Sequence, residues 1–144
     1  MTALAANKNV PHLGDEAVVQ LLKLKQKGST TIYQGALVVI NAGYAAPATT
    51  ATGLIAVGRG EKYSANAGAD GAVLCEVRRG IFAFENSTAG DAIAQADVGK
   101  ACYIVDDQTV AKTDGGSTRS LAGRIISINE GDSKVYVEVG LFNP

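Results

Sequence analysis

The sequence has few of the side chains on which enzymes most often rely. Its 144 residues include no Trp, one His, one Met and two Cys. A Ser-His-Asp or Cys-His device would have to use the single histidine, His12, which lies in a segment short of large apolar residues. We therefore expect no catalytic residues and no cofactor, and we expect that the protein is not an enzyme.

Long apolar runs and an excess of one charge are also missing. No stretch approaches 18 consecutive apolar residues, and the first ten residues lack the apolar segment of a secretory signal. The 13 basic and 14 acidic side chains give a formal charge of −1. A protein that binds nucleic acid by bulk electrostatics should be clearly basic. We therefore expect neither a membrane nor a nucleic acid as a partner.

The small net charge conceals an uneven distribution. Residues 1–34 carry four Lys against Asp15 and Glu16, which is +2, and the remaining residues carry −3. A mildly basic N-terminal segment could dock on an acidic surface. Lysines that keep an exposed edge strand from aggregating would give the same pattern.

The two cysteines, Cys75 and Cys102, each lie in an apolar run. A disulfide would require their strands to be neighbours. A zinc site needs about four closely spaced ligands, and the sequence holds no C-x-x-C pair. The pattern favours two buried, reduced thiols and no metal site.

Small residues and short β patterns make up most of the chain. There are 17 Gly and 23 Ala, and short β-branched runs alternate with turn residues. This pattern predicts an all-β fold, which would be a single small β-barrel or β-sandwich (β-tulip-like) of about eight short strands. Because Ala and Gly bury little area, we expect stability to come partly from oligomer contacts.

Several segments have specific expected structures. Residues 30–41 predict one strand, and residues 44–51 a loop or an irregular edge. Residues 72–86 predict a long strand with a bulge or bend at Gly80. The last hairpin is expected over residues 121–140.

The N-terminal part of the chain differs from the rest. Residues 1–17 predict an extended arm, and residues 18–144 a single β domain. Residues 15–27 fit either a helical face or an alternating strand, of which we favour the strand.

Two adjacent carboxylates, Asp106 and Asp107, would point to opposite faces of a strand. The pair is explained if it lies in a turn, where the carboxylates accept hydrogen bonds from backbone N–H groups. A weak cation site is the alternative. The glycine-rich residues 58–63 begin like a phosphate-binding loop, but Tyr63 stands where the third Gly belongs. Neither stretch predicts catalysis.

Two adjacent arginines, Arg78 and Arg79, should face opposite sides of the long strand. One of them needs a carboxylate or an interface. We expect a structural ion pair with Glu76 or Glu85, or with an acidic group across a subunit interface.

A set of segments along nearly the whole chain resembles one family. They are residues 1–7, 32–38, 68–72, 76–82, 86–87, 97–100, 103–110, 122–126 and 135–137. Their order and spacing are similar to those of tailed-bacteriophage capsid decoration proteins, also called cement or head-stabilising proteins. No single segment is chemically diagnostic, so the likeness lies in their succession.

The resemblance implies a structural protein of the virion. Members of the family bind the outer surface of the expanded capsid as homotrimers at three-fold and quasi-three-fold positions, and stabilise it against the pressure of the packaged DNA. The implied partners are the major capsid protein and further copies of the chain. The implied location is the virion, after synthesis in the host bacterial cytoplasm.

The family's N-terminal arm reaches onto the capsid lattice. The resemblance maps this role onto Thr2, Ala3, Leu4, Asn7, Lys8, Asn9, Val10, Pro11, His12 and Leu13. Residues 15–27 would continue the contact by strand addition.

Three other functions are compatible with the sequence. A tail or baseplate adaptor would have the same composition. A small capsid-associated hydrolase would have to use His12 or the Asp106–Asp107 pair. A sugar-binding β module would lack its usual exposed Trp, because the chain has none and Phe82 and Phe84 read as internal.

Overall fold

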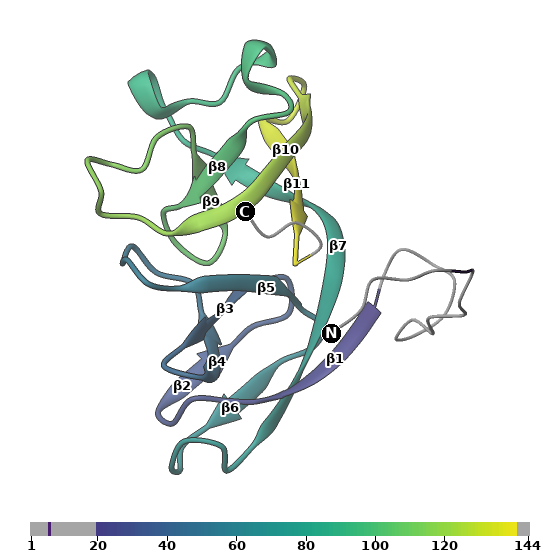
Figure 1. Cartoon of the computed structure of the whole chain (residues 1–144), viewed down its shortest axis with the longest axis vertical. Coiled ribbons are helices and arrows are strands. Elements are labelled where there is room, and N and C mark those ends of the chain that lie inside the picture. The colour runs from purple at the N-terminus through teal and green to yellow at the C-terminus, as the bar shows by residue number, and fades with distance from the viewer. Residues whose placement is uncertain (1–5, 7–19, 141–144) are drawn as a thin grey trace.

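Strands form nearly all the regular structure of Ala6 and residues 20–140, the part of the chain that the computed structural model describes (Figure 1). The eleven strands are β1 (Gln20–Lys25), β2 (Thr30–Ile32), β3 (Leu37–Asn41), β4 (Tyr44–Pro47), β5 (Ile55–Gly60), β6 (Ser64–Asn66), β7 (Leu74–Asn86), β8 (Ala101–Ile104), β9 (Thr109–Ala111), β10 (Leu121–Asn129) and β11 (Lys134–Val139). Two single 3₁₀ turns, η1 (Ala89–Asp91) and η2 (Gln95–Asp97), complete the elements. The predicted all-β class is confirmed, with more and shorter strands than expected.

One half of the fold is a closed barrel of five strands. β7 pairs with β11, β11 with β10, β10 with β8, β8 with β9, and β9 returns to β7 as the single parallel pair. Its interior is packed with β-branched residues such as Val110, Val135 and Val137, together with Phe84. Closure leaves no free edge in this half, which suits strands this short.

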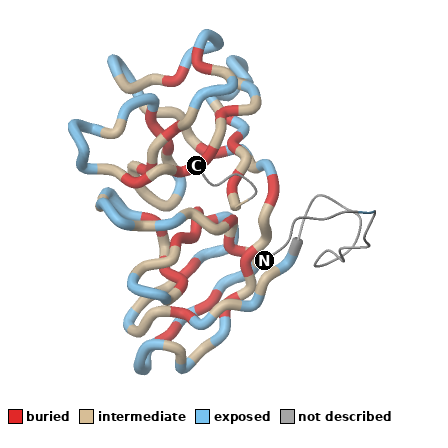
Figure 2. Tube along the Cα trace, viewed as in Figure 1, coloured by how far each residue is buried: buried red, intermediate tan, exposed pale blue. Residues whose placement is uncertain are grey.

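The other half of the fold, which we call the lower lobe, contains β1 to β6 and the first half of β7. β1 and β5 flank β7, β5 pairs with β3, and β3 pairs with β4. β2 and β6 form a separate two-stranded sheet. The lobe has its own apolar cluster, in which Ile32, Val38, Cys75 and Val77 are buried. Figure 2 shows buried residues in both halves.

The long strand β7 belongs to both halves. Its odd-numbered residues Cys75 and Val77 lie in the lower-lobe cluster, whereas its even-numbered Phe82 and Phe84 lie in or against the barrel core. Successive side chains point to opposite faces of a strand, so the two cores lie on opposite faces of β7. The change of side falls around Gly80, where the sequence predicts a bend.

β3 lies between the two cores. Leu37 and Val39 belong to the barrel cluster, and Val38 between them belongs to the lower-lobe cluster. All three side chains are fully buried, so the strand has no solvent face. Figure 1 shows β3 and β5 as the layer between the barrel above and β2, β4 and β6 below.

Two expectations for the segments around β3 need correction. Residues 30–41 form two strands because a turn interrupts them, in which Ala36 N–H donates to Tyr33 O at 3.1 Å and Gly35 has a φ of +91°. Glycine adopts that left-handed conformation without the steric cost that other residues bear. Residues 44–51 include a true strand, since β4 pairs with β3 in regular register.

A buried glutamine, Gln26, joins β1 to the β2–β6 sheet. Its amide nitrogen donates to the carbonyl oxygens of Thr30 at 3.0 Å and Ser64 at 3.1 Å, and its amide oxygen accepts from Ser64 Oγ at 2.6 Å. Asn66 donates to the Gln26 backbone oxygen at 3.0 Å. The side chain of Gln26 is fully buried. A buried polar group that is fully bonded fixes one arrangement, because every alternative leaves atoms unpaired.

We predict that Gln26→Ala destabilises the protein by about 3 kcal/mol, because it removes the hydrogen bonds that the side chain makes to the buried Ser64 hydroxyl and to the carbonyls of Ser64 and Thr30. Urea denaturation followed by circular dichroism measures the change. The exposed Gln34 provides the matched control, and Gln34→Ala should change the free energy of unfolding by less than about 0.5 kcal/mol. Equal effects of the two substitutions would contradict this role of Gln26.

Candidate functional site

The predicted capsid-binding arm lies outside the residues that the structure describes. This holds for Thr2 through Leu4 and for Asn7 through Leu13, including His12. The strand favoured within residues 15–27 is confirmed over Gln20–Lys25. One edge of β1 is occupied by β7 of the same chain, with Gln20 opposite Arg79 and Lys25 opposite Leu74.

Arg78 forms an ion pair within the chain, but not with either carboxylate expected from the sequence. Its Nε donates to Glu61 Oε2 at 2.7 Å, and Arg59 Nη2 donates to the same oxygen at 3.1 Å. Glu76 instead pairs with Lys62 at 2.8 Å, and Glu85 pairs with Lys134. The register between β5 and β7 places Arg59 opposite Arg78, and Glu61 neutralises both.

The two arginine side chains beside Glu61 lie where the lower lobe meets the barrel. The Arg59 guanidinium carbon is 4.6 Å from the centre of the Phe82 ring, a cation–π distance. The guanidinium of Arg78, followed by that of Arg59, holds the pKa of Glu61 below its usual value. The three charged side chains remain about one-third exposed, so their role is to orient rather than to supply large stability.

Arg79 takes part neither in the ion pairs of Glu61 nor in those of Glu76 and Glu85. It lies in β7 directly before Gly80, and its Nε is buried without a hydrogen-bond partner among residues 20–140. Its side chain packs close to Gly140 at the end of β11. The expected ion pair is therefore formed by Arg78 within the chain, and a subunit-interface role for Arg79 stays a prediction.

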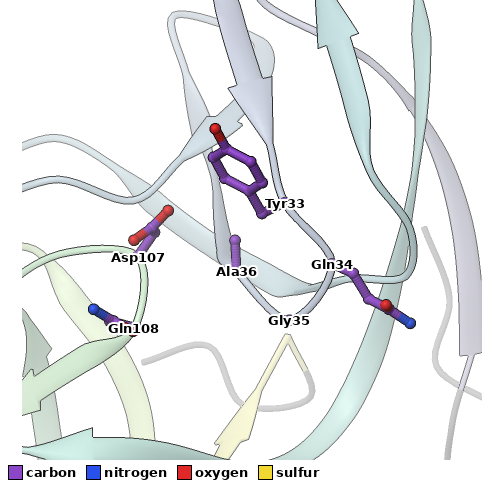
Figure 3. Close-up of a pocket in the computed structure, with 6 residues that line it drawn as sticks. All are labelled: Tyr33, Gln34, Gly35, Ala36, Asp107 and Gln108. Atoms are coloured by element: carbon purple, nitrogen blue, oxygen red, sulfur yellow. The ribbon is translucent and has the colours of Figure 1, made fainter.

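A surface pocket of about 420 Å³ lies where the turn before β3 meets the turn between β8 and β9. Its walls are Tyr33, Gln34, Gly35, Ala36, Asp107 and Gln108. Figure 3 shows the Tyr33 ring above Ala36 and Asp107 to its left, whereas the Gln34 side chain points to the right, away from both. The two walls are tied together because Leu37 N–H donates to Asp107 O at 2.7 Å.

The adjacent carboxylates at this pocket have different environments. Asp106 Oδ1 accepts from the backbone N–H of Gln108 at 2.9 Å, which confirms the predicted turn role. Burial, and then the charge of Asp106, raises the pKa of Asp107. No Lys or Arg among the described residues forms an ion pair with Asp107. The pocket therefore holds a carboxylate that lacks a cation.

Two exposed tyrosines from different connections lie beside each other, Tyr33 between β2 and β3 and Tyr63 between β5 and β6. The ring centres of Tyr33 and Tyr63 are 5.7 Å apart, and each side chain is 61% exposed. An aromatic ring beside a carboxylate is suited to a cationic side chain, because both the ring face and the carboxylate attract positive charge. None of the six residues that line the pocket is a Ser, Thr, Cys, Lys or His.

Both cysteines are buried and free, as expected from the sequence. Cys75 lies in the lower-lobe cluster and Cys102 in the barrel core, so they belong to different cores. Burial raises the pKa of Cys75, and it raises the pKa of Cys102 to about 12.

No family model, curated protein or solved structure matches this chain. Among the described residues, no group of three or more His, Cys, Asp or Glu side chains is arranged to hold a metal ion. No helix in the same residues is long and apolar enough to cross a membrane.

We predict opposite pH effects for two carboxylates. Glu61 has a lowered pKa in the fold, so the stability it contributes is present above pH 4.5 and is lost as the pH falls below that value. Asp107 has a raised pKa, so its ionisation on going up from pH 3.8 destabilises the fold. Glu61→Gln should therefore lower, and Asp107→Asn raise, the free energy of unfolding at pH 7.

Urea denaturation of both variants at pH 7 and pH 3 provides the comparison. As the pH falls below 4.5 the unfolded chain takes up a proton at Glu61, and below 3.8 Asp107 is protonated in both states, so each difference from the wild type should be smaller at pH 3 than at pH 7. A stability difference of the same size at both pH values would show that charge is not the cause.

We also predict that neither thiol reacts in the native protein, since only the exposed thiolate is nucleophilic. On addition of an aromatic disulfide reagent at pH 8, the native protein should displace less than one-tenth of an equivalent of the reagent's aromatic thiolate in an hour. In denaturant two equivalents should be displaced, one by Cys75 and one by Cys102, each of which forms a mixed disulfide with the reagent. Fast labelling of the native fold would mean that one core opens readily.

Proposed function

We propose that this protein is a head decoration protein of a tailed bacteriophage, which binds the outside of the expanded capsid as a homotrimer and stabilises it against internal pressure. The observation that carries the proposal is the ordered set of segments from residues 1–7 to residues 135–137, which resembles that family along nearly the whole chain. The N-terminal arm, residues 1–17, would reach the major capsid protein.

Features of the described residues are consistent with a binding role. Large apolar side chains are exposed on several strands and turns, including Tyr33, Ile55, Tyr63 and Leu74, each more than half exposed. Exposed aromatic and aliphatic groups of this kind are common in contact surfaces. The polar groups of the pocket are a carboxylate and amides, which suit recognition of charge better than hydrolysis.

The proposal is tested with expanded heads assembled without this protein. Full-length protein added to such heads should bind in regular arrays that are visible by cryo-electron microscopy, and should delay the release of DNA on heating. Deletion of residues 1–17 should reduce attachment at least tenfold while leaving the circular dichroism spectrum unchanged. The exposed Glu130 gives a matched control, because Glu130→Lys should leave attachment unchanged.

Two results would contradict the proposal. One is that the full-length protein does not bind expanded heads. The other is that gold-labelled antibody against the protein marks the tail or baseplate of the mature particle, which would favour the structural adaptor instead.

A further inference from the structure

The two halves of the fold carry opposite charges. Residues 20–80, which form the lower lobe, contain seven basic and three acidic side chains, a net charge of +4. Residues 81–140, which complete the barrel, contain five basic and nine acidic side chains, a net charge of −4. The overall charge of −1 therefore conceals a strong electrical polarity. Opposite ends of two such molecules attract and like ends repel, which favours a head-to-tail encounter.

The lower lobe has an exposed basic sheet face. Leu21, Lys23 and Lys25 alternate along β1, and the register places Lys25 opposite Leu74 and Lys23 opposite Glu76 on β7. Residues opposite each other share a face, so these side chains lie together on the side away from the lower-lobe core. We call this set, with Arg78, the β1–β7 face.

Exposure marks the β1–β7 face as a contact surface. Leu21 is 41% exposed and Leu74 57% exposed, and both lysines of β1 are exposed as well. No hydrogen bond or ion pair joins Lys23 or Lys25 to another described residue. Lys23 lies opposite Glu76 and attracts it, but forms no ion pair with it, and Lys25 lies opposite the apolar Leu74. Exposed apolar side chains with cations between them suit a partner that offers carboxylates and aromatic rings.

The pocket of Tyr33 and Asp107 offers that complement. It joins an unpaired carboxylate to an exposed ring, its volume of about 420 Å³ lies in the range of ligand pockets, and Asp106 adds a second negative charge. Burial already raises the pKa of Asp107, and an arriving ammonium group would lower it again. The pocket lies where the two halves meet, and its carboxylate, Asp107, belongs to the negative barrel and can receive a cation of the positive lobe.

We propose that copies of this chain associate head to tail, with Lys23 and Lys25 of one copy against the Tyr33–Asp107 pocket of the next. The contact is heterologous, so it produces a closed ring when the rotation closes and an open chain when it does not. The inference deepens the homo-oligomer part of the proposed function and rests on that part alone. It needs neither a capsid nor the N-terminal arm.

Two variants with complementary defects test the arrangement. The face variant is Lys23→Glu with Lys25→Glu, and the pocket variant is Tyr33→Ala with Asp107→Asn. Each variant alone should need at least tenfold more protein to self-associate than the wild type, as measured by sedimentation velocity at low salt. Mixed in equal amounts, the two should form a one-to-one dimer and nothing larger, because only one sound pair of surfaces remains.

Controls separate the contact from general charge effects and from misfolding. Two single variants, Lys112→Glu and Glu130→Lys, reverse one charge each on the barrel. Each should self-associate at the same protein concentration as the wild type. All variants should keep the circular dichroism spectrum of the wild type. Raising the salt concentration from 0.05 M to about 1 M should weaken wild-type association, since the Debye length falls to about 3 Å at 1 M.

Three results would overturn the inference. They are a wild type that stays monomeric at all concentrations tested, a face or pocket variant that assembles as well as wild type, and a mixture that remains monomeric. A protein that assembles as expected but does not bind expanded heads would instead contradict the proposed function and leave this contact standing.

Discussion

The architecture depends on one strand that takes part in two hydrophobic cores. β7 presents Cys75 and Val77 to the lower lobe and Phe82 and Phe84 to the barrel, on opposite faces of the same backbone. No helix covers either sheet in the described residues. The strands that the two halves share are therefore shielded from water by the packing of the two halves on each other. The buried β3, which packs its two faces against the two cores, completes this arrangement. Loss of packing in one half would therefore expose a face of the strands it shares with the other.

Sequence patterns predicted the elements that are governed by local periodicity. The hairpin of β10 and β11 followed from the alternation of Val135, Val137 and Val139 with polar residues, and all three valines are buried. A lone glycine in a long strand predicted a bulge or bend at Gly80, and the buried side chains of β7 change from one core to the other around that residue. The turn that separates β2 from β3 was missed, because apolar and β-branched residues continue on both sides of Tyr33 and Gln34 and conceal the interruption.

The candidate site depends on contacts that no local pattern encodes. Glu61 becomes the partner of Arg78 only through the register between β5 and β7. Tyr33 and Asp107 are distant in sequence, and they meet because the β8–β9 turn bonds to the start of β3. Gln26 could have been noticed as a polar residue at the end of the alternating β1 segment. Its partners Ser64 and Asn66 lie in a small, polar stretch that gave no sign of a buried network.

The register of β1 on β7 also has a mechanical consequence. The strands are antiparallel, so the pair nearest the N-terminal residues, Gln20 with Arg79, is also the pair nearest the barrel. Tension between the segment before Gln20 and the barrel would load that pair first and then each following pair in turn. The ladder would peel rather than shear, and would yield at a lower force than one whose bonds break together. β1 would then release before the barrel core is disturbed, and Leu24 would leave the lower-lobe cluster with it.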